Sequence, residues 1–345
     1  MKIVEAVAID NVSIVFGDHP QEALPLMDAM QDRAEIQTAT GQVLGVHDCS
    51  LTVQQGEILV LMGLSGSGKS TLLRAINGLN PVVRGAVSVH DGSGMVDVTN
   101  ADAPTLRRVR QNHVAMVFQQ FGLLPWRTVR ENVGLGLELS GLSRSDRRAQ
   151  VNRQLDLVGL ADWADRKVGE LSGGMQQRVG LARAFATEAP ILLMDEPFSA
   201  LDPLIRTRLQ DELLDLQKEL RRTIIFVSHD LDEAFKLGNR IAIMEGGRIM
   251  QCGTPQQIFS APANDYVADF VAHMNPLGVL CARDVMEPVG DTPPVDCVAP
   301  DMSIQDVMTQ VIETGRPVGV IADGEILGQI SGDSVLAKLL DPRGG

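Results

Sequence analysis

A glycine loop between an apolar segment and a helical segment constrains this chain more than any other feature. Residues 58–71 read I-L-V-L-M-G-L-S-G-S-G-K-S-T. The apolar run 58–62 predicts a buried strand, and L-L-R-A-I after Thr71 predicts a helix. In that context G-x-x-x-x-G-K-S predicts a loop that binds a nucleoside triphosphate. The alternative is a ligand-free Gly/Ser-rich turn, and the flanking strand and helix argue against it.

The residue types of this loop suit phosphate binding. Its glycines allow the backbone to turn tightly and to point several N–H groups inward at a helix N-terminus, where the helix dipole also favours an anion. Lys69 would contact the β- and γ-phosphates, and the Ser70 hydroxyl would bind Mg²⁺. The predicted nucleotide-binding residues of the loop are Gly63, Leu64, Ser65, Gly66, Ser67, Gly68, Lys69, Ser70 and Thr71.

Charged groups follow two other apolar runs. Ile191–Met194 ends in Asp195 and Glu196. Two adjacent carboxylates at the end of a buried strand are costly unless they meet a metal ion or a proton donor. His229 follows the apolar run 223–227, with Ser228 between them. A lone histidine is more often structural, but this placement in a chain with a phosphate loop makes a functional histidine the better hypothesis.

Two shorter signals are weak when taken alone. In L-S-G-G at 171–174, Ser172 is a suitable N-cap for the helix that follows, and the two glycines allow an anion to approach the helix N-terminus. Phe16 ends a predicted strand upstream of the phosphate loop. It could stack on adenine or belong to the core, and the pattern alone favours the core.

Length and composition restrict the class of protein. A chain of 345 residues suggests two or three domains, and a net charge of −14 disfavours binding to nucleic acid. The four cysteines form no C-x-x-C pair, which fits a reducing compartment and argues against zinc. No apolar run approaches the roughly 18 residues of a transmembrane helix, and the N-terminus is interrupted by acidic residues. We therefore expect neither a membrane span nor a signal peptide.

Two segments interrupt the predicted strands with helices. Residues 18–42 predict a short amphipathic helical excursion between strands at 3–16 and 43–53. Its apolar face would contact either a partner or its own sheet, and its own sheet is the simpler expectation. Residues 128–163 predict helices with short loops, placed between two sheet segments.

The C-terminal part differs from the rest in charge. N-P-L-G at 275–278 predicts a boundary. The tail from Cys281 onward has 4 basic and 11 acidic residues, a net charge of −7 and half that of the whole chain. Its patterns predict short strands and helices. A unit of about 60 residues is marginally stable alone, so we expect it to pair.

The order of these segments resembles the ATPase subunits of ABC transporters over roughly residues 3–270. Gly63–Ser70 resembles a Walker A loop, Ile191–Asp195 resembles a Walker B strand, and L-S-G-G resembles the signature that lies between them. Three features narrow the resemblance to one group of these ATPases. They are the insert at 18–42, the string M-G-L-S-G-S-G-K-S-T, and the signature L-S-G-G-M in place of L-S-G-G-Q. They are similar to the ATPases of glycine betaine and choline importers, with the choline branch the most similar.

This resemblance implies an α/β fold. A P-loop NTPase of the ABC cassette type would occupy residues 1–275, with a RecA-like α/β core, an antiparallel β subdomain and a helical signature subdomain at about 120–185. The tail has A-R-D-V-M at 282–286 and G-R-P-V-G-V-I-A-D-G at 315–324, which resemble a single CBS unit. A small α+β domain for regulation or dimerisation is thus implied over 279–345. Relatives often carry two CBS units in tandem, whereas this chain has room for one. The regulatory role of the paired units therefore does not carry over directly to this chain.

The resemblance also implies roles for single residues. Glu196 would polarise the attacking water, His229 would link the γ-phosphate to Glu196, and Gln119 would lie near Mg²⁺. The implied ligands of the metal ion are Ser70, Gln119 and Asp195. Adenine would stack on Phe16. The residues implied to act on ATP held by a second subunit, or at the seam between subunits, are Ser172, Gly173, Gly174 and Asp202.

The implied mechanism needs two subunits. ATP with Mg²⁺ would close a head-to-tail dimer, and hydrolysis would reopen it. The implied partners are a second copy of the chain, transmembrane permease subunits that dock beside Gln119 and residues 121–129, and, indirectly, a periplasmic or lipid-anchored solute-binding protein. Nucleic acid is not among them. The implied location is peripheral, on the cytoplasmic face of the inner (plasma) membrane.

Two other classes compete with the importer subunit. A soluble ABC ATPase that acts on nucleic acid or ribosomes usually shows long coiled coils, duplicated cassettes or basic patches, none of which is evident. A P-loop kinase would not need L-S-G-G between its two nucleotide-binding strands. Physical reasoning from this sequence does not identify the transported solute, because the ATP-binding subunit does not contact it. The choice between choline and glycine betaine rests on resemblance alone.

Overall fold

The computed structural model describes residues 4–272, 274–290 and 294–340. The described residues fall into two compact units, one of residues up to 229 with 242–249, and one of residues 230–241 with those from 250 onward. The domain boundary predicted at 275–278 separates parts that would fold independently. The division into compact units does not test this boundary, which stays a prediction. The outer ends of the two predicted domains, residues 1–3 and 341–345, lie outside the described residues.

An antiparallel sheet begins the first unit. Within residues 4–97 its four strands lie in the order β2-β1-β4-β5. The first two strands pair from Phe16 opposite Val43 to Glu5 opposite Gln54, with bulges between. Alternating polar and apolar residues put one face of this sheet into the core. The strands are β1 (Glu5–Phe16), β2 (Val43–Gln54), β4 (Arg84–His90) and β5 (Met95–Asp97).

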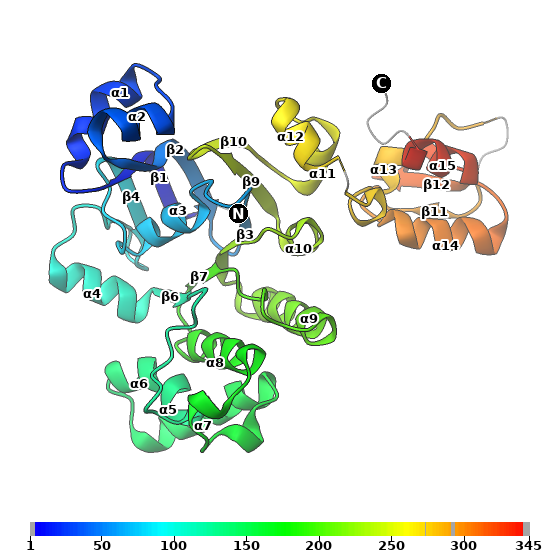
Figure 1. The fold of residues 1–345 in the computed structure, drawn as a ribbon. Coiled ribbons are helices and arrows are strands. Elements are labelled where there is room, and N and C mark those ends of the chain that lie inside the picture. The colour runs from blue at the N-terminus through cyan, green and yellow to red at the C-terminus, as the bar shows by residue number, and fades with distance from the viewer. Residues whose placement is uncertain (1–3, 273, 291–293, 341–345) are drawn as a thin grey trace. The chain divides into compact units, whose positions relative to one another are not determined.

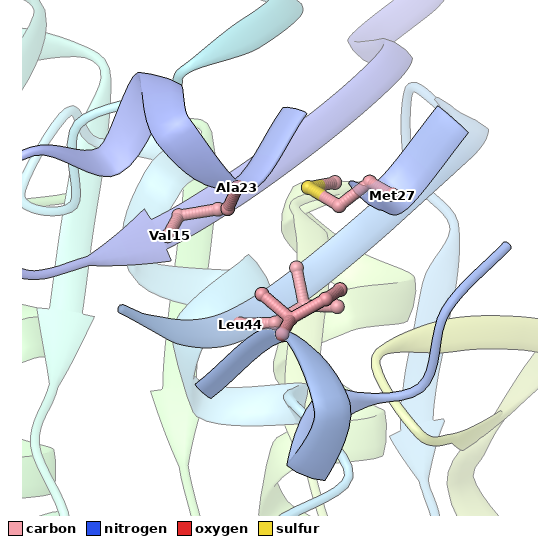
Figure 2. Packing of buried hydrophobic residues seen from close by; sticks show 5 residues of the cluster. Val15, Ala23, Met27 and Leu44 are labelled. Atoms are coloured by element: carbon pink, nitrogen blue, oxygen red, sulfur yellow. The ribbon is translucent and has the colours of Figure 1, made fainter. Parts of the chain in front are cut away.

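The insert at 18–42 lies between β1 and β2 and packs on this sheet. Its helical turns are η1 (Pro20–Ala23), α1 (Leu24–Asp28) and α2 (Arg33–Thr40). Met27 and Ile36 are fully buried in a cluster with Val15, Ala23 and Leu44. Figure 2 shows the side chains of Ala23 and Met27 from the insert gathered with Val15 and Leu44 from the strands. The expectation that the insert packs on its own sheet is confirmed.

A larger sheet carries the strands that end in candidate site residues. Over residues 58–253, all of which the structure describes, six strands lie in the order β10-β9-β3-β8-β7-β6. Strands β3, β8, β7 and β6 are parallel neighbours. The first three of these are buried at every residue, as expected for central parallel strands. The bounds are β3 (Ile58–Met62), β6 (Val114–Val117), β7 (Ile191–Asp195), β8 (Thr223–Val227), β9 (Arg240–Glu245) and β10 (Arg248–Gly253).

Several helices lie between these strands in the sequence. The helix after the glycine loop is α3 (Lys69–Ile76), and α9 (Pro203–Leu220) confirms the helix predicted over 203–220. The sequence did not predict α4 (Ala103–Asn112), although its start has an ordinary signal. The Asp102 carboxylate accepts a hydrogen bond from the N–H of Thr105, and Pro104 occupies the first turn.

The predicted helical insert forms a block of its own between β6 and β7. Figure 1 shows α5, α6, α7 and α8 grouped together. Helix α8 follows the L-S-G-G segment and packs against α5 and α7. The bounds are α5 (Val129–Val133), α6 (Leu135–Leu139), α7 (Arg144–Leu157), η2 (Ala161–Trp163), η3 (Val168–Glu170) and α8 (Gly173–Ala186).

The second unit contains a small sheet with helices. Among the described residues of the tail, three strands lie in the order β11-β12-β13, with the first pair parallel and the second antiparallel. The strands are β11 (Cys297–Val298), β12 (Val318–Ala322) and β13 (Glu325–Ile330). The helices are α10 (Leu231–Leu237), α11 (Pro255–Ser260), α12 (Asp265–Phe270), η4 (Pro276–Gly278), α13 (Ala282–Val285), α14 (Ile304–Thr314) and α15 (Gly332–Leu340).

None of the helices in the described part of the chain has the length and apolar content that crossing a bilayer demands.

Candidate nucleotide site

The phosphate loop between β3 and α3 needs glycine at two positions. Gly63 has φ +142°, and a Cβ there would lie 2.1 Å from the carbonyl oxygen of Met244. Gly68 has φ +100°, and a Cβ there would lie 2.6 Å from the carbonyl oxygen of Gly45. Both conformations disfavour other residues, and neither position has room for a side chain. The loop is therefore pressed against neighbouring backbone on two sides.

Lys69 lies under this loop with its side chain largely buried. Its ammonium donates to the carbonyl oxygens of Gly63 and Leu64, at 2.8 Å each. Burial lowers the pKa of Lys69, while the nearby carboxylates of Glu196 and Asp195 act in the opposite direction. The cation is thus held at the loop, where phosphate oxygens are better partners for it than neutral carbonyls.

Ser70 and Asp195 meet across the site. The Ser70 hydroxyl donates to Oδ1 of Asp195 at 2.6 Å, and Arg74 donates to Oδ2 at 2.8 Å. Asp195 ends β7 and is fully buried, whereas Arg74 reaches it from α3. A hydroxyl and a carboxylate oxygen are hard donors that suit Mg²⁺, which usually completes its shell with phosphates and water. The residues present therefore fit the predicted ion.

Glu196 lies at the centre of a second group. Its Oε2 accepts from Nε2 of Gln119 at 3.3 Å and lies 3.5 Å from Nδ1 of His229. The three residues follow the carboxyl ends of β7, β6 and β8, which are neighbouring parallel strands. Glu196 has φ +50°, a conformation that glutamate rarely adopts. The structure thus brings together a carboxylate, an amide and an imidazole that are far apart in the sequence.

These groups face one pocket of about 520 Å³. This volume lies within the range of small-molecule sites. The lining residues that the sequence predicted are Phe16, Ser65, Gly66, Gly68, Lys69, Ser70, Thr71, Gln119, Glu196 and His229. Gly63, Leu64, Ser67 and Asp195 are not among the described lining residues, but they contact Lys69 or Ser70.

The signature residues lie elsewhere in the described structure and do not line the pocket of their own chain. Ser172 caps α8, and its hydroxyl accepts from the N–H of Met175 at 3.3 Å. A Cβ on Gly174 would lie 3.1 Å from the carbonyl oxygen of Ala200. Asp202 caps α9 through the N–H of Ile205 at 3.1 Å. The structure therefore groups the predicted residues into a pocket set and a signature set.

Sequence reasoning missed several residues of this site. Arg33 and Gln37 of the insert line the pocket. The buried amide of Gln177 in α8 donates to the Glu196 carbonyl at 3.2 Å and accepts from the N–H of Ala200 at 3.1 Å. Their partners lie many residues away in the sequence. A polar residue at a buried position of α8 was the one available signal for Gln177, and α2 offered none for Arg33.

Comparisons with known proteins agree with this geometry. The sequence model of the ABC transporter family matches residues 46–199. The "Glycine betaine/proline betaine transport system ATP-binding protein ProV" of Salmonella typhimurium is 44% identical over 340 residues, which cover 97% of this chain and 83% of that protein. The "Trimethylamine N-oxide transport system ATP-binding protein TmoW" of Ruegeria pomeroyi is 44% identical over 336 residues, or 96% of each chain.

Solved structures show the same cassette. The dimeric post-hydrolysis state of the ATP-binding cassette MJ0796, bound to ADP and Pi, matches with a TM-score of 0.62 and 30% identity over 72% of this chain and 98% of that one. The resemblance to ATP-binding subunits of glycine betaine importers and the predicted cassette fold are both confirmed. This chain belongs to the ATP-binding subunits of ABC transporters and is an ATPase of that family.

Proposed function

We propose that this chain powers the uptake of glycine betaine, choline or a related quaternary amine through an ABC importer. The observation that carries the proposal is the convergence of Lys69, Ser70 and Glu196 on one pocket, with Asp195 bonded to Ser70 beside it. Several relatives at 44–49% identity are named as ATP-binding proteins of glycine betaine transport. The cargo and the roles of single residues are proposals.

The residues of the pocket divide the work of hydrolysis. Lys69 and the loop N–H groups bind and orient the β- and γ-phosphates. Ser70 and Asp195 would hold Mg²⁺, with Gln119 beside them, and the ion would neutralise charge on the phosphates when bound. Glu196 accepts a hydrogen bond from the attacking water and draws its proton away. His229 would contact the γ-phosphate, and its Nδ1, which lies 3.5 Å from Oε2 of Glu196, would help to keep that carboxylate in place.

A second copy of the chain completes each site. Ser172, Gly173 and Gly174 do not line the pocket formed by their own chain, so they are free to cover the γ-phosphate of a partner. Asp202 caps α9 and would lie at the seam. Two of the matched solved structures are dimers of ATP-binding cassettes, which supports this arrangement. ATP would then join the two subunits, and its hydrolysis would separate them.

A cavity in the helical block offers a surface for the permease. It measures about 1080 Å³ and is lined by residues of α5, α6 and α7 together with Trp126, Arg127 and Lys167. Trp126 is 67% exposed, which is unusual for so large an aromatic side chain. The cavity includes part of the segment 121–129 that the sequence suggested for docking. An exposed aromatic ringed by charged side chains suits a helix from a partner subunit.

The remaining expectations concern place and assembly. With permease partners the subunit would sit at the cytoplasmic face of the inner (plasma) membrane, and a periplasmic or lipid-anchored binding protein would deliver cargo from the other side. The tail over 279–345 would pair with its twin as a CBS-like unit. Its small three-stranded sheet with helices α14 and α15 supports this proposal.

Reconstitution tests the proposal directly. The full chain with its permease subunits in proteoliposomes should take up glycine betaine or choline when ATP is supplied on the side of the ATPase. The binding protein is added on the opposite side, and trimethylamine N-oxide serves as a third solute. A complex that carries Glu196→Gln is the matched control and should show no uptake. ATPase activity stimulated by nucleic acid or ribosomes, without uptake of any of the three solutes, would overturn the proposal.

A further inference from the structure

The insert between β1 and β2 is built so that the first residue of α2 is held firmly. Ile36 of α2 is fully buried in the cluster with Val15, Ala23, Met27 and Leu44. Asp32 and Glu35 form a capping box, with hydrogen bonds of 2.8 and 2.9 Å between side chain and backbone. A capped and packed helix of this kind does not shift easily relative to its sheet. The side chain at position 33 therefore starts from a fixed point.

That side chain is Arg33, which reaches the phosphate loop. Nη1 donates to the carbonyl oxygen of Gly66 at 2.6 Å, and Nη2 donates to that of Gly45 at 2.5 Å. Gly66 belongs to the loop, and Gly45 lies on β2 at the pocket wall. Burial lowers the pKa of Arg33, but a guanidinium stays protonated in a protein. Both bonds are therefore assisted by charge and are stronger than neutral ones.

The bond to Gly66 fixes one peptide group of the loop from both ends. The carbonyl of this peptide is held by Arg33, and its N–H, on Ser67, donates to the carbonyl of Leu64 at 3.2 Å. The next carbonyl, of Ser67, accepts from the N–H of Gly247 at 3.1 Å. Because these two carbonyls are held by hydrogen bonds, the N–H groups that follow at the start of α3 are oriented before phosphate binds.

We propose that Arg33 is a positioning residue of the nucleotide site, which holds the phosphate loop in its binding shape and makes the insert at 18–42 part of that site. The inference rests on the ATP-binding function proposed above and assigns a role to a segment that lies upstream of the matched family region at 46–199. Arg33 acts through the loop backbone. Its loss should therefore weaken ATP binding more than it slows the chemical step.

The test compares two arginines that both anchor the insert. Arg84 on β4 forms a two-pronged ion pair with Asp28 of α1, at 2.5 and 3.0 Å, and does not line the pocket in the described structure. ATP affinity of the full chain is measured by competition with a fluorescent ATP analogue, together with KM, kcat and the midpoint of thermal unfolding. The variants are Arg33→Ala, Arg33→Lys and, as the matched control, Arg84→Ala.

In Arg33→Ala the Kd and KM for ATP should rise about 10-fold with kcat within a factor of three, as expected for the loss of charge-assisted bonds. Arg33→Lys can reach one carbonyl and should recover part of the affinity, whereas Arg84→Ala should stay within twofold of wild type. An unchanged Kd in Arg33→Ala, or an equal rise in Arg84→Ala, would overturn the inference. A wild-type chain that binds no ATP would instead overturn the proposed function.

Discussion

Glu196 shows how one residue can be held for a task. Its backbone lies at φ +50°, its carbonyl accepts from Gln177, and its carboxylate lies between Gln119 and His229. A non-glycine residue in this conformation costs free energy, and the surrounding hydrogen bonds keep it there. The carboxylate therefore has little freedom to turn away from the pocket.

Replacing this carboxylate should separate binding from hydrolysis. Glu196→Gln keeps the size of the side chain and the bond from Gln177 to the backbone, so ATP affinity should stay close to wild type. Hydrolysis should slow by about 10²–10⁴-fold because the amide cannot take a proton from water. Phosphate release under single-turnover conditions measures the effect, and Lys69→Ala, which should lose binding, is the contrast. Hydrolysis at the wild-type rate would remove Glu196 from the mechanism.

The site residues that could be predicted from the sequence are those that belong to a recognisable motif. The Gly63–Ser70 loop and the Asp195–Glu196 pair lie where strand ends were expected, because each follows a run of buried apolar residues. Arg33 and Arg74 were not predicted. Arg33 pairs with the loop carbonyl of Gly66, and Arg74 pairs with Asp195. Such pairs depend on how strands and helices pack, and no local pattern encodes them.

At the scale of elements, the insert depends on a small apolar cluster. Helices this short are unstable in isolation and gain their stability from packing on the sheet. Met27 contributes a fully buried side chain, while Met30, three residues later, is 73% exposed. The same residue type thus occupies the inner and the outer side of one segment.

This contrast gives a direct test of the insert. Met27→Ala should lower the free energy of unfolding by about 2–4 kcal/mol, since it leaves a cavity in the cluster. Met30→Ala should change it by less than about 0.5 kcal/mol, the usual range for a surface substitution. Denaturant titration followed by circular dichroism measures both. Equal effects of the two substitutions would contradict the packing described here.

Periodicity explains which elements were predicted. Buried strands such as β3 and β7, and the long helix α9, have strong patterns and were placed nearly to the residue. Helix α4 was missed because five of its ten residues are arginine, glutamine or asparagine, gathered in R-R-V-R-Q-N, and Val109 is its one buried residue. The two-residue strand β11 is shorter than any pattern can define.

For the whole molecule, the nucleotide pocket lies within the first of the two units, and this position leads to a prediction about deletion of the tail. Every described residue that lines the nucleotide pocket lies at or before position 229. Deletion of residues 279–345 should therefore leave most of the ATPase activity, provided that α11 and α12 remain folded. Activity per folded protein measures this, with circular dichroism as the check on folding.

The same deletion also tests the predicted domain boundary. The second unit groups residues 230–241 and 250–275 with the tail, and Gln256 of α11 donates to the sulfur of Cys281 at 3.7 Å. A truncated chain that aggregates would show that these contacts are needed for folding. In that case the tail would be part of the core, and the boundary at 275–278 would be wrong.

The residues that line the nucleotide pocket determine where two such subunits can be joined in a chimaera. Of the fifteen lining residues in the described structure, Phe16, Arg33, Gln37, Val43, Leu44 and Gly45 precede the matched family region at 46–199. A chimaera that joins this cassette to a foreign leader at residue 46 would keep every motif that hydrolysis requires. It would still lose one side of its nucleotide pocket, so exchanges between transporters should be cut before β1.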